Sequence, residues 1–171
     1  MITQFEPDFP KTEYKILVDG KDSKQLRQTS TPIDPKLIKS EEFKLFTKIL
    51  FDSMMKVKLE DGWMHAGISA IQIGVPIRVF YAFDGINEKY VLYINPEIEF
   101  IDAATDLKEE ACLSVPNCTD KVRRYKKIRI KYHDIDGNKT SARLQGWNAR
   151  VVQHENDHLN GILFTDKVGQ I

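Results

Sequence analysis

Cysteine is scarce in this chain, and long apolar runs are missing. Only Cys112 and Cys118 are cysteines among the 171 residues, which excludes the multi-disulfide framework of small secreted domains. A single Cys112–Cys118 bridge is the remaining alternative, and a reducing compartment disfavours it. No run has the length of a membrane span, and residues 1–15 show neither a secretory nor a transit-peptide pattern. We therefore expect a cytoplasmic protein that does not enter a membrane.

An excess of charge of either sign is also missing. Lys and Arg number 25 and Asp and Glu number 25, so the whole molecule has no strong field that would attract nucleic acid or an anionic membrane. We expect no direct nucleic-acid site. The chain shows no repeat or flexible linker and is long enough to bury one core, which predicts a single domain over residues 1–171. Residues 1–35, with four of the seven prolines, are expected to be largely irregular.

Two segments have helical periodicity. Ser40 can cap a helix, and apolar residues then recur at helical spacing, which predicts a helix from residue 40 to about residue 59. A second helix is predicted from about Asn148 to Asn160, with Gly161 as its stop. Strands are predicted over residues 77–83, 90–95 and 128–135, the last followed by an Asp-Gly turn. This order of elements indicates an α+β fold.

The second predicted helix carries an HExxH motif, formed by His154, Glu155 and His158. Four residues make slightly more than one helical turn, so both imidazoles leave the same face and can bind one metal ion, with Glu155 beside them. The alternative is a solvated helix whose histidines lie near its surface.

Two histidines do not complete a catalytic metal site, which usually has three protein ligands and one open position. A metallopeptidase that cleaves internal peptide bonds would be expected to supply its third ligand after His158, but Asp166 is the only acid in that short tail. Upstream, Cys112 could supply a thiolate as the third ligand.

At this point the sequence resembles the peptide deformylase family. The three motifs are GISAIQIG at residues 67–74, EACLS at residues 110–114 and HENDH at residues 154–158, in the family's order and at comparable separations. The similarity covers roughly residues 60 to 166 and includes Asn95-Pro96 and Gln153. It implies small antiparallel sheets packed around a central helix that carries HExxH, with a second helix in the N-terminal half.

The resemblance also assigns roles to individual residues. Cys112, His154 and His158 would hold one divalent metal ion, and Glu155 would be the general acid and base. The side-chain amide of Gln72 and the backbone N–H of Leu113 would stabilise the oxyanion. The substrate would bind as an added strand beside Gly67 and Ile68, with Trp147, Arg150, Val151 and His154 near its methionine side chain, and Glu110 would form a buried salt bridge with Arg124.

Three positions depart from the family pattern. His65 and Ala111 stand where the family has glycine, and Ser69 replaces an alanine. Glycine at position 65 would allow an unusual backbone angle, so His65 puts the local geometry in question. His65 could also be mistaken for a metal ligand. The methyl group of Ala111 would either narrow the site or show that the backbone there is ordinary β structure.

The implied activity is removal of the N-formyl group from the initiator methionine of new polypeptides, with release of formate. A catalytically weak relative that binds metal and recognises formylated peptides is the alternative, supported by His65 and Ala111. Ferrous iron is the metal that the resemblance favours, with Zn²⁺ second and Ni²⁺ or Co²⁺ also compatible with a Cys/His₂ site. The implied partners are N-formylated nascent peptides near the ribosome exit, and the implied state is a monomer.

Overall fold

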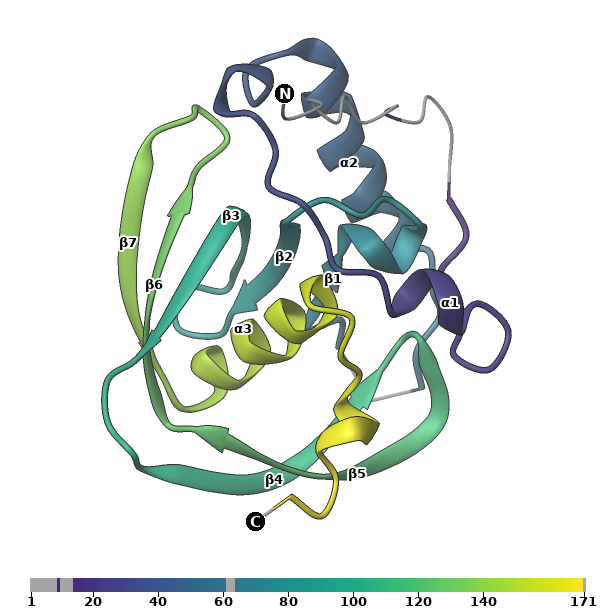
Figure 1. Ribbon diagram of the computed structural model, residues 1–171, viewed down its shortest axis with the longest axis vertical. Coiled ribbons are helices and arrows are strands. Elements are labelled where there is room, and N and C mark those ends of the chain that lie inside the picture. Colours follow the sequence, from purple (N-terminus) through teal and green to yellow (C-terminus); the bar gives the residue numbers. More distant parts are fainter. Residues whose placement is uncertain (1–8, 10–13, 61–63, 171) are drawn as a thin grey trace.

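The computed structural model describes residues 9, 14–60 and 64–170, and its elements form two antiparallel sheets and a few helices (Figure 1). One sheet has five strands in the order β1-β2-β3-β6-β7, and the other consists of β4 and β5. The α+β prediction is therefore confirmed. The elements are α1 (Ser23–Leu26), η1 (Pro35–Leu37), α2 (Glu41–Met55), β1 (Gly67–Ser69), η2 (Ala70–Ile73), β2 (Val79–Asp84), β3 (Lys89–Phe100), β4 (Thr105–Cys112), β5 (Val115–Tyr125), β6 (Lys127–His133), β7 (Lys139–Gln145), α3 (Gly146–Leu159) and η3 (Phe164–Lys167).

Strand β2 shows how the two long helices are placed. Its side chains alternate between two hydrophobic clusters, with Val79 and Tyr81 in the cluster around α2, and Phe80 and Ala82 in the cluster around α3. Successive side chains of a strand point to opposite faces of the sheet. Helices α2 and α3 therefore pack on opposite faces of the sheet at β2.

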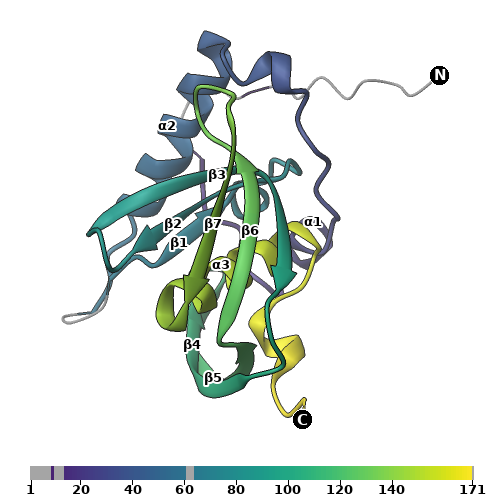
Figure 2. The same ribbon diagram turned by 90° about the vertical axis from the view of Figure 1, so that its left-hand side faces the viewer.

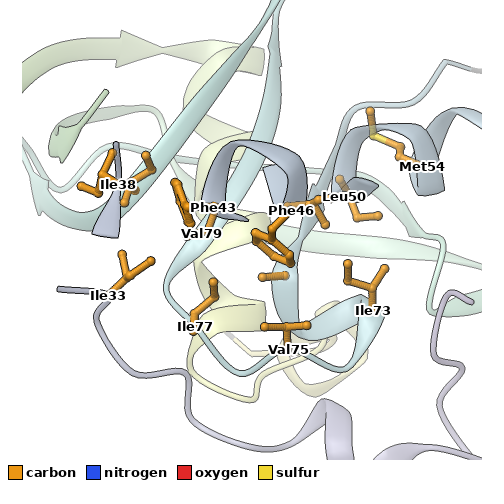
Figure 3. Packing of buried hydrophobic residues seen from close by; sticks show 13 residues of the cluster. Ile33, Ile38, Phe43, Phe46, Leu50, Met54, Ile73, Val75, Ile77 and Val79 are labelled. Carbon is orange, nitrogen blue, oxygen red and sulfur yellow. The ribbon is translucent and has the colours of Figure 1, made fainter. Parts of the chain in front are cut away.

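Helix α2 begins where its sequence predicts. The Ser40 hydroxyl accepts a hydrogen bond from the Phe43 N–H at 3.1 Å, which satisfies one of the free donors of the first turn. Phe43, Phe46 and Leu50 are fully buried and pack against the sheet and η2 (Figure 3). The helix ends at Met55, four residues before the predicted end, and residues 57–60 line a cleft instead.

Helix α3 is buried on nearly all sides and lies at the centre of the fold (Figure 1). Ala149, Val152 and Leu159 pack on the five-stranded sheet. Buried polar groups need hydrogen-bond partners, and the helix finds them: Asn148 donates to Asp84, and the Gln153 amide both accepts from and donates to the backbone of Tyr125. The predicted bounds of 148–160 are close to the observed ones.

The β4–β5 hairpin passes across α3 at the end of the molecule away from α2 (Figures 1 and 2). It shares no strand pairing with the larger sheet. Its inward side chains are Glu110, Val122 and Arg124, which are all buried. The hairpin carries the EACLS segment, so it brings this motif against the helix with the histidines.

Other predicted elements are observed with shifted bounds. The predicted strands 77–83, 90–95 and 128–135 correspond to β2, β3 and β6. Strand β3 continues past Asn95, which adopts a positive φ of 50° at a register shift and exchanges two hydrogen bonds with the backbone of Ile33. Within the part of the chain that the structure describes, no helix is long and apolar enough to cross a bilayer.

Candidate metal centre and catalytic cleft

Two histidines of α3 and one cysteine of β4 converge beside the helix. The rings of His154 and His158 have centroids 4.9 Å apart, as expected for one helical turn. The Sγ of Cys112 lies 3.3 Å from Nε2 of His158. One ligand atom from each of the three residues lies within 4.8 Å of the other two. The fold thus brings the predicted ligands together, although Cys112 and His154 are 42 positions apart in the sequence.

His65 does not belong to this group. In the described ranges, Cys112, His154 and His158 form the one group of three or more possible ligands. His65 lines the neighbouring cleft, and its φ is not positive. Ala111 lies in strand β4, also without a positive φ, and is exposed. Both departures from glycine therefore fall on backbone that other residues adopt without strain.

The charges around the centre favour a cation. Burial opposes the charged form of His154, but the Cys112 thiolate and Glu110 outweigh this effect and raise the pKa of His154 well above its usual value. Burial and the nearby positive charge lower the pKa of His158 well below its usual value. A bound cation would satisfy the same negative groups that attract a proton to His154. The donor set and its electrostatics therefore fit a divalent metal ion.

A buried carboxylate orients His154. Glu110 accepts hydrogen bonds from His154 Nδ1 at 2.9 Å, from Arg124 Nε and Nη2 at 2.9 and 2.8 Å, and from Arg150 Nη1 at 2.6 Å. Burial alone would raise the pKa of Glu110, but Arg124 and His154 outweigh it and hold that pKa well below its usual range. Because Nδ1 is engaged, Nε2 of His154 is left for a metal, as in other histidine metal sites. The predicted Glu110–Arg124 salt bridge is confirmed.

Gln72 and Leu113 lie on the other side of the centre. The Gln72 side chain, from η2, places Nε2 3.7 Å from Cys112 Sγ and 3.1 Å from Ser114 Oγ. Its Oε1 accepts from the N–H of Ser69 at 2.8 Å, so the amide has one defined orientation. Leu113 lies in the turn between β4 and β5 and lines the same cleft. Both predicted oxyanion residues therefore border the metal centre.

Glu155 is buried between α3 and β1. Its side chain is only 3% exposed, and one carboxylate oxygen, Oε2, accepts from the hydroxyl of Ser69 at 2.7 Å. Burial raises the pKa of Glu155 to about 7, against the lowering effects of charged His154 and the Ser69 hydrogen bond. Gly67 is in contact with the same carboxylate, since a Cβ there would lie 2.7 Å from Oε1 and 2.6 Å from the carbonyl oxygen of Tyr81. Position 67 therefore requires glycine, because any side chain there would collide with Glu155 and with the backbone of Tyr81.

A cleft of about 690 Å³ opens from the centre towards β1. Trp147, Arg150 and Val151 line it, as predicted, but the Arg150 guanidinium is already bonded to Glu110, Asp106 and a backbone carbonyl. Gly67 lines the cleft, whereas Ile68 is fully buried in the core and is not part of the cleft wall. Strand β1 is the edge of its sheet and pairs on one side with β2.

Comparisons with known proteins decide the family. The family model of polypeptide deformylase matches residues 13–171. The chain belongs to the polypeptide deformylase family. It is 39% identical over 153 residues to a peptide deformylase of Rhodopirellula baltica, a match that covers 85% of this chain and 69% of that protein. Against a peptide deformylase of Thermotoga maritima it is 35% identical over 158 residues, covering 91% of this chain and 87% of that protein.

Solved structures of deformylases share the fold. The crystal structure of the Thermotoga maritima enzyme matches with a TM-score of 0.78 at 34% identity, covering 92% of this chain and 99% of that one. A peptide deformylase of Acinetobacter baumannii with Met-Ala-Ser bound matches with a TM-score of 0.79 at 28% identity, covering 93% and 100%. The chain is a metal-dependent hydrolase that removes the N-formyl group from newly made polypeptides.

Several residues of the site were not singled out from the sequence. Ser114 accepts from Gln72 and donates its backbone N–H to Cys112 Sγ at 3.4 Å. Asp157, inside HExxH, pairs with Arg124. The only sequence signal for both was their place within a motif. Cys118 also lines the cleft, and both cysteines are free, so the bridge between them does not form.

Proposed function

We propose that Cys112, His154 and His158 hold one divalent metal ion and that Glu155 is the general acid and base of deformylation. The observation that carries this proposal is the convergence of a cysteine sulfur and two imidazoles within 4.8 Å beside a buried carboxyl group. A divalent ion held there would act as a Lewis acid and would lower the pKa of water towards neutrality.

The remaining chemistry belongs to the chain's own residues. Glu155 accepts a proton from the attacking water and returns it to the amine as the formyl C–N bond breaks and formate forms. A pKa near 7 suits a group that must both accept and release a proton at physiological pH. The Gln72 amide and the Leu113 N–H are proposed to donate to the oxyanion that develops on the formyl oxygen.

The substrate is proposed to add a strand to the free edge of β1. Backbone groups of Gly67 and Ile68 would hold its main chain, while apolar walls that include Trp147 and Val151 accept the methionine side chain. The structure with bound Met-Ala-Ser from Acinetobacter baumannii, whose peptide begins with methionine, supports this choice. Arg150 is proposed to form part of the pocket wall, where its hydrogen bond to Glu110 holds its side chain in place.

Finer features of the enzyme are also proposed. A mixed Cys/His₂ donor set accepts Fe²⁺, Zn²⁺, Ni²⁺ and Co²⁺. We favour Fe²⁺ as the native metal, with Zn²⁺ second, on the resemblance to the family. The family match from residue 13 to residue 171 supports one catalytic domain. Because its substrates are nascent chains, we place the protein in the cytoplasm near the ribosome exit, acting as a monomer.

Release of formate from formyl-Met-Ala-Ser tests the proposal directly. Glu155→Gln keeps size and shape but cannot accept the proton, so we expect kcat to fall by about 10²–10⁴-fold while metal content persists. Glu99→Gln, at an exposed carboxylate of β3, is the matched control. Metal-loaded Glu155→Gln with the activity of the parent would show that the assigned base is wrong. A metal-loaded parent that binds the peptide without turnover would favour the weak-relative alternative.

A further inference from the structure

Ser69 lies between the two proposed catalytic side chains. It is the last residue of β1, is fully buried, and directly precedes η2, which carries Gln72. Its side chain faces Glu155, and its backbone N–H faces Gln72. Most of the deformylase motif is retained around it, but this position departs from the family's alanine. The hydroxyl is therefore an addition of this chain to the pattern.

The hydroxyl contacts Glu155 at two atoms. Oγ is 2.7 Å from the carboxylate Oε2 and 2.9 Å from the backbone carbonyl oxygen of the same residue. A serine hydroxyl has one hydrogen, and a hydrogen bond to a charged acceptor is the stronger of the two. Both acceptor oxygens belong to Glu155, so the position of the hydroxyl relative to this residue is fixed.

The hydrogen bond from Ser69 restricts the terminal side-chain torsion of Glu155, which the helix backbone leaves free. The terminal torsion of glutamate is broad and roughly two-fold, so the backbone of α3 does not fix the plane of the carboxylate. On one side Oε1 lies against Gly67, where a Cβ would be 2.7 Å away. On the other side Oε2 is held by Ser69. The hydroxyl thus selects one orientation of the carboxylate within a space that Gly67 leaves open.

The backbone of Ser69 has a separate task. Its N–H donates to Oε1 of Gln72 at 2.8 Å, which turns Nε2 of that amide towards Cys112 and Ser114. Any residue except proline would supply this N–H. Replacing Ser69 with alanine therefore removes the contact with Glu155 and leaves the contact with Gln72 in place.

We propose that Ser69 is a positioning residue for deformylation and that its hydroxyl aims the Glu155 carboxylate at the attacking water. The proposal rests on the assignment of Glu155 as the base. A positioned acid or base contributes about 10²–10⁴-fold, and loss of its orientation should remove part of this. For Ser69→Ala we expect kcat about tenfold lower, with unchanged KM and metal content. A role in substrate binding or metal binding would change KM or metal content instead.

The experiment is a cycle of the parent, Ser69→Ala, Glu155→Gln and the double variant, each loaded with metal and assayed for formate release from formyl-Met-Ala-Ser. Single-turnover conditions with excess enzyme keep the slow variants measurable. Ser53→Ala is the matched control, because Ser53 is also buried and its hydroxyl donates to a backbone carbonyl at 2.7 Å within α2. We expect this control to retain the kcat of the parent.

The cycle separates the two proposals. If Ser69 acts through Glu155, the serine substitution lowers kcat in the parent and has no further effect in the Glu155→Gln background. Parent-like kcat for Ser69→Ala, or an equal loss in both backgrounds, would overturn the positioning role. Full activity of Glu155→Gln alone would overturn the assignment of the base. The metal content of Ser69→Ala should match that of Ser53→Ala, and loss of metal would overturn the proposal.

Discussion

Glu110→Gln would remove one negative charge from a buried cluster that also contains Arg124 and Arg150. The Glu110 side chain is 5% exposed and accepts charged hydrogen bonds from both guanidinium groups. An amide keeps one acceptor oxygen but directs N–H donors at positively charged donors. Removing one partner of a buried ion pair costs about 3–5 kcal/mol. Each guanidinium keeps an aspartate partner, so we expect the lower end, about 3 kcal/mol.

Urea unfolding of the metal-free protein measures this loss without the stabilisation that bound metal adds. With a slope of about 2 kcal/mol per molar urea, the midpoint should fall by about 1.5 M. Glu99→Gln breaks contacts with Lys131 and Arg129 at the surface and should shift the midpoint far less. Equal shifts for the two variants would refute the reasoning that burial makes the Glu110 cluster costly to break.

Three further outcomes are expected. Cys112→Ala should lose the bound metal on dialysis while Cys118→Ala retains it, and full occupancy in the first variant by elemental analysis would exclude that thiolate as a ligand. Gly67→Ala places a methyl group 2.7 Å from Glu155 Oε1 and should lower kcat by about 100-fold through misplacement of the base; unchanged kcat would contradict the contact. Burial raises the pKa of Asp84, but hydrogen bonds in its turn outweigh this and lower it, so its ionised form stabilises the fold above about pH 4. The stability deficit of Asp84→Asn at pH 7 should therefore shrink as the pH falls through that region, and a pH-independent difference in urea midpoints would count against it.

The sequence places the two histidines of the candidate metal centre because the information for them is local. His154 and His158 share one face of a helix whose period appears in the apolar residues around them. Cys112 could be paired with them only through the resemblance to a family, since nothing in the spacing places residue 112 near residue 154. The helix end predicted near residue 59 was wrong because the apolar Val57 and Leu59 continue the periodic pattern but line the cleft.

The β4–β5 hairpin could not be predicted in the same way. Strand prediction depends on apolar residues at alternate positions, and the buried positions of this hairpin include Glu110 and Arg124. Charged residues that pair with each other occupy these buried positions. In the sequence, such a pattern is typical of a solvent-exposed segment. The contact between Ser69 and Glu155 could not be predicted either, because it joins positions that are 86 residues apart.

The separation of the β4–β5 hairpin from the main sheet has a consequence for how the site opens. Cooperative units of a protein can unfold locally with free energies well below that of global unfolding. Cys112 belongs to the hairpin and the two imidazoles belong to α3, so detachment of the hairpin would divide the proposed ligand set while the five-stranded sheet stays folded. Two ion pairs fasten the hairpin to α3 next to these side chains, one between Glu110 of β4 and Arg150 and one between Arg124 of β5 and Asp157. The residence time of a bound ion would then follow the opening rate of this hairpin, which amide hydrogen exchange along β4 and β5 reports.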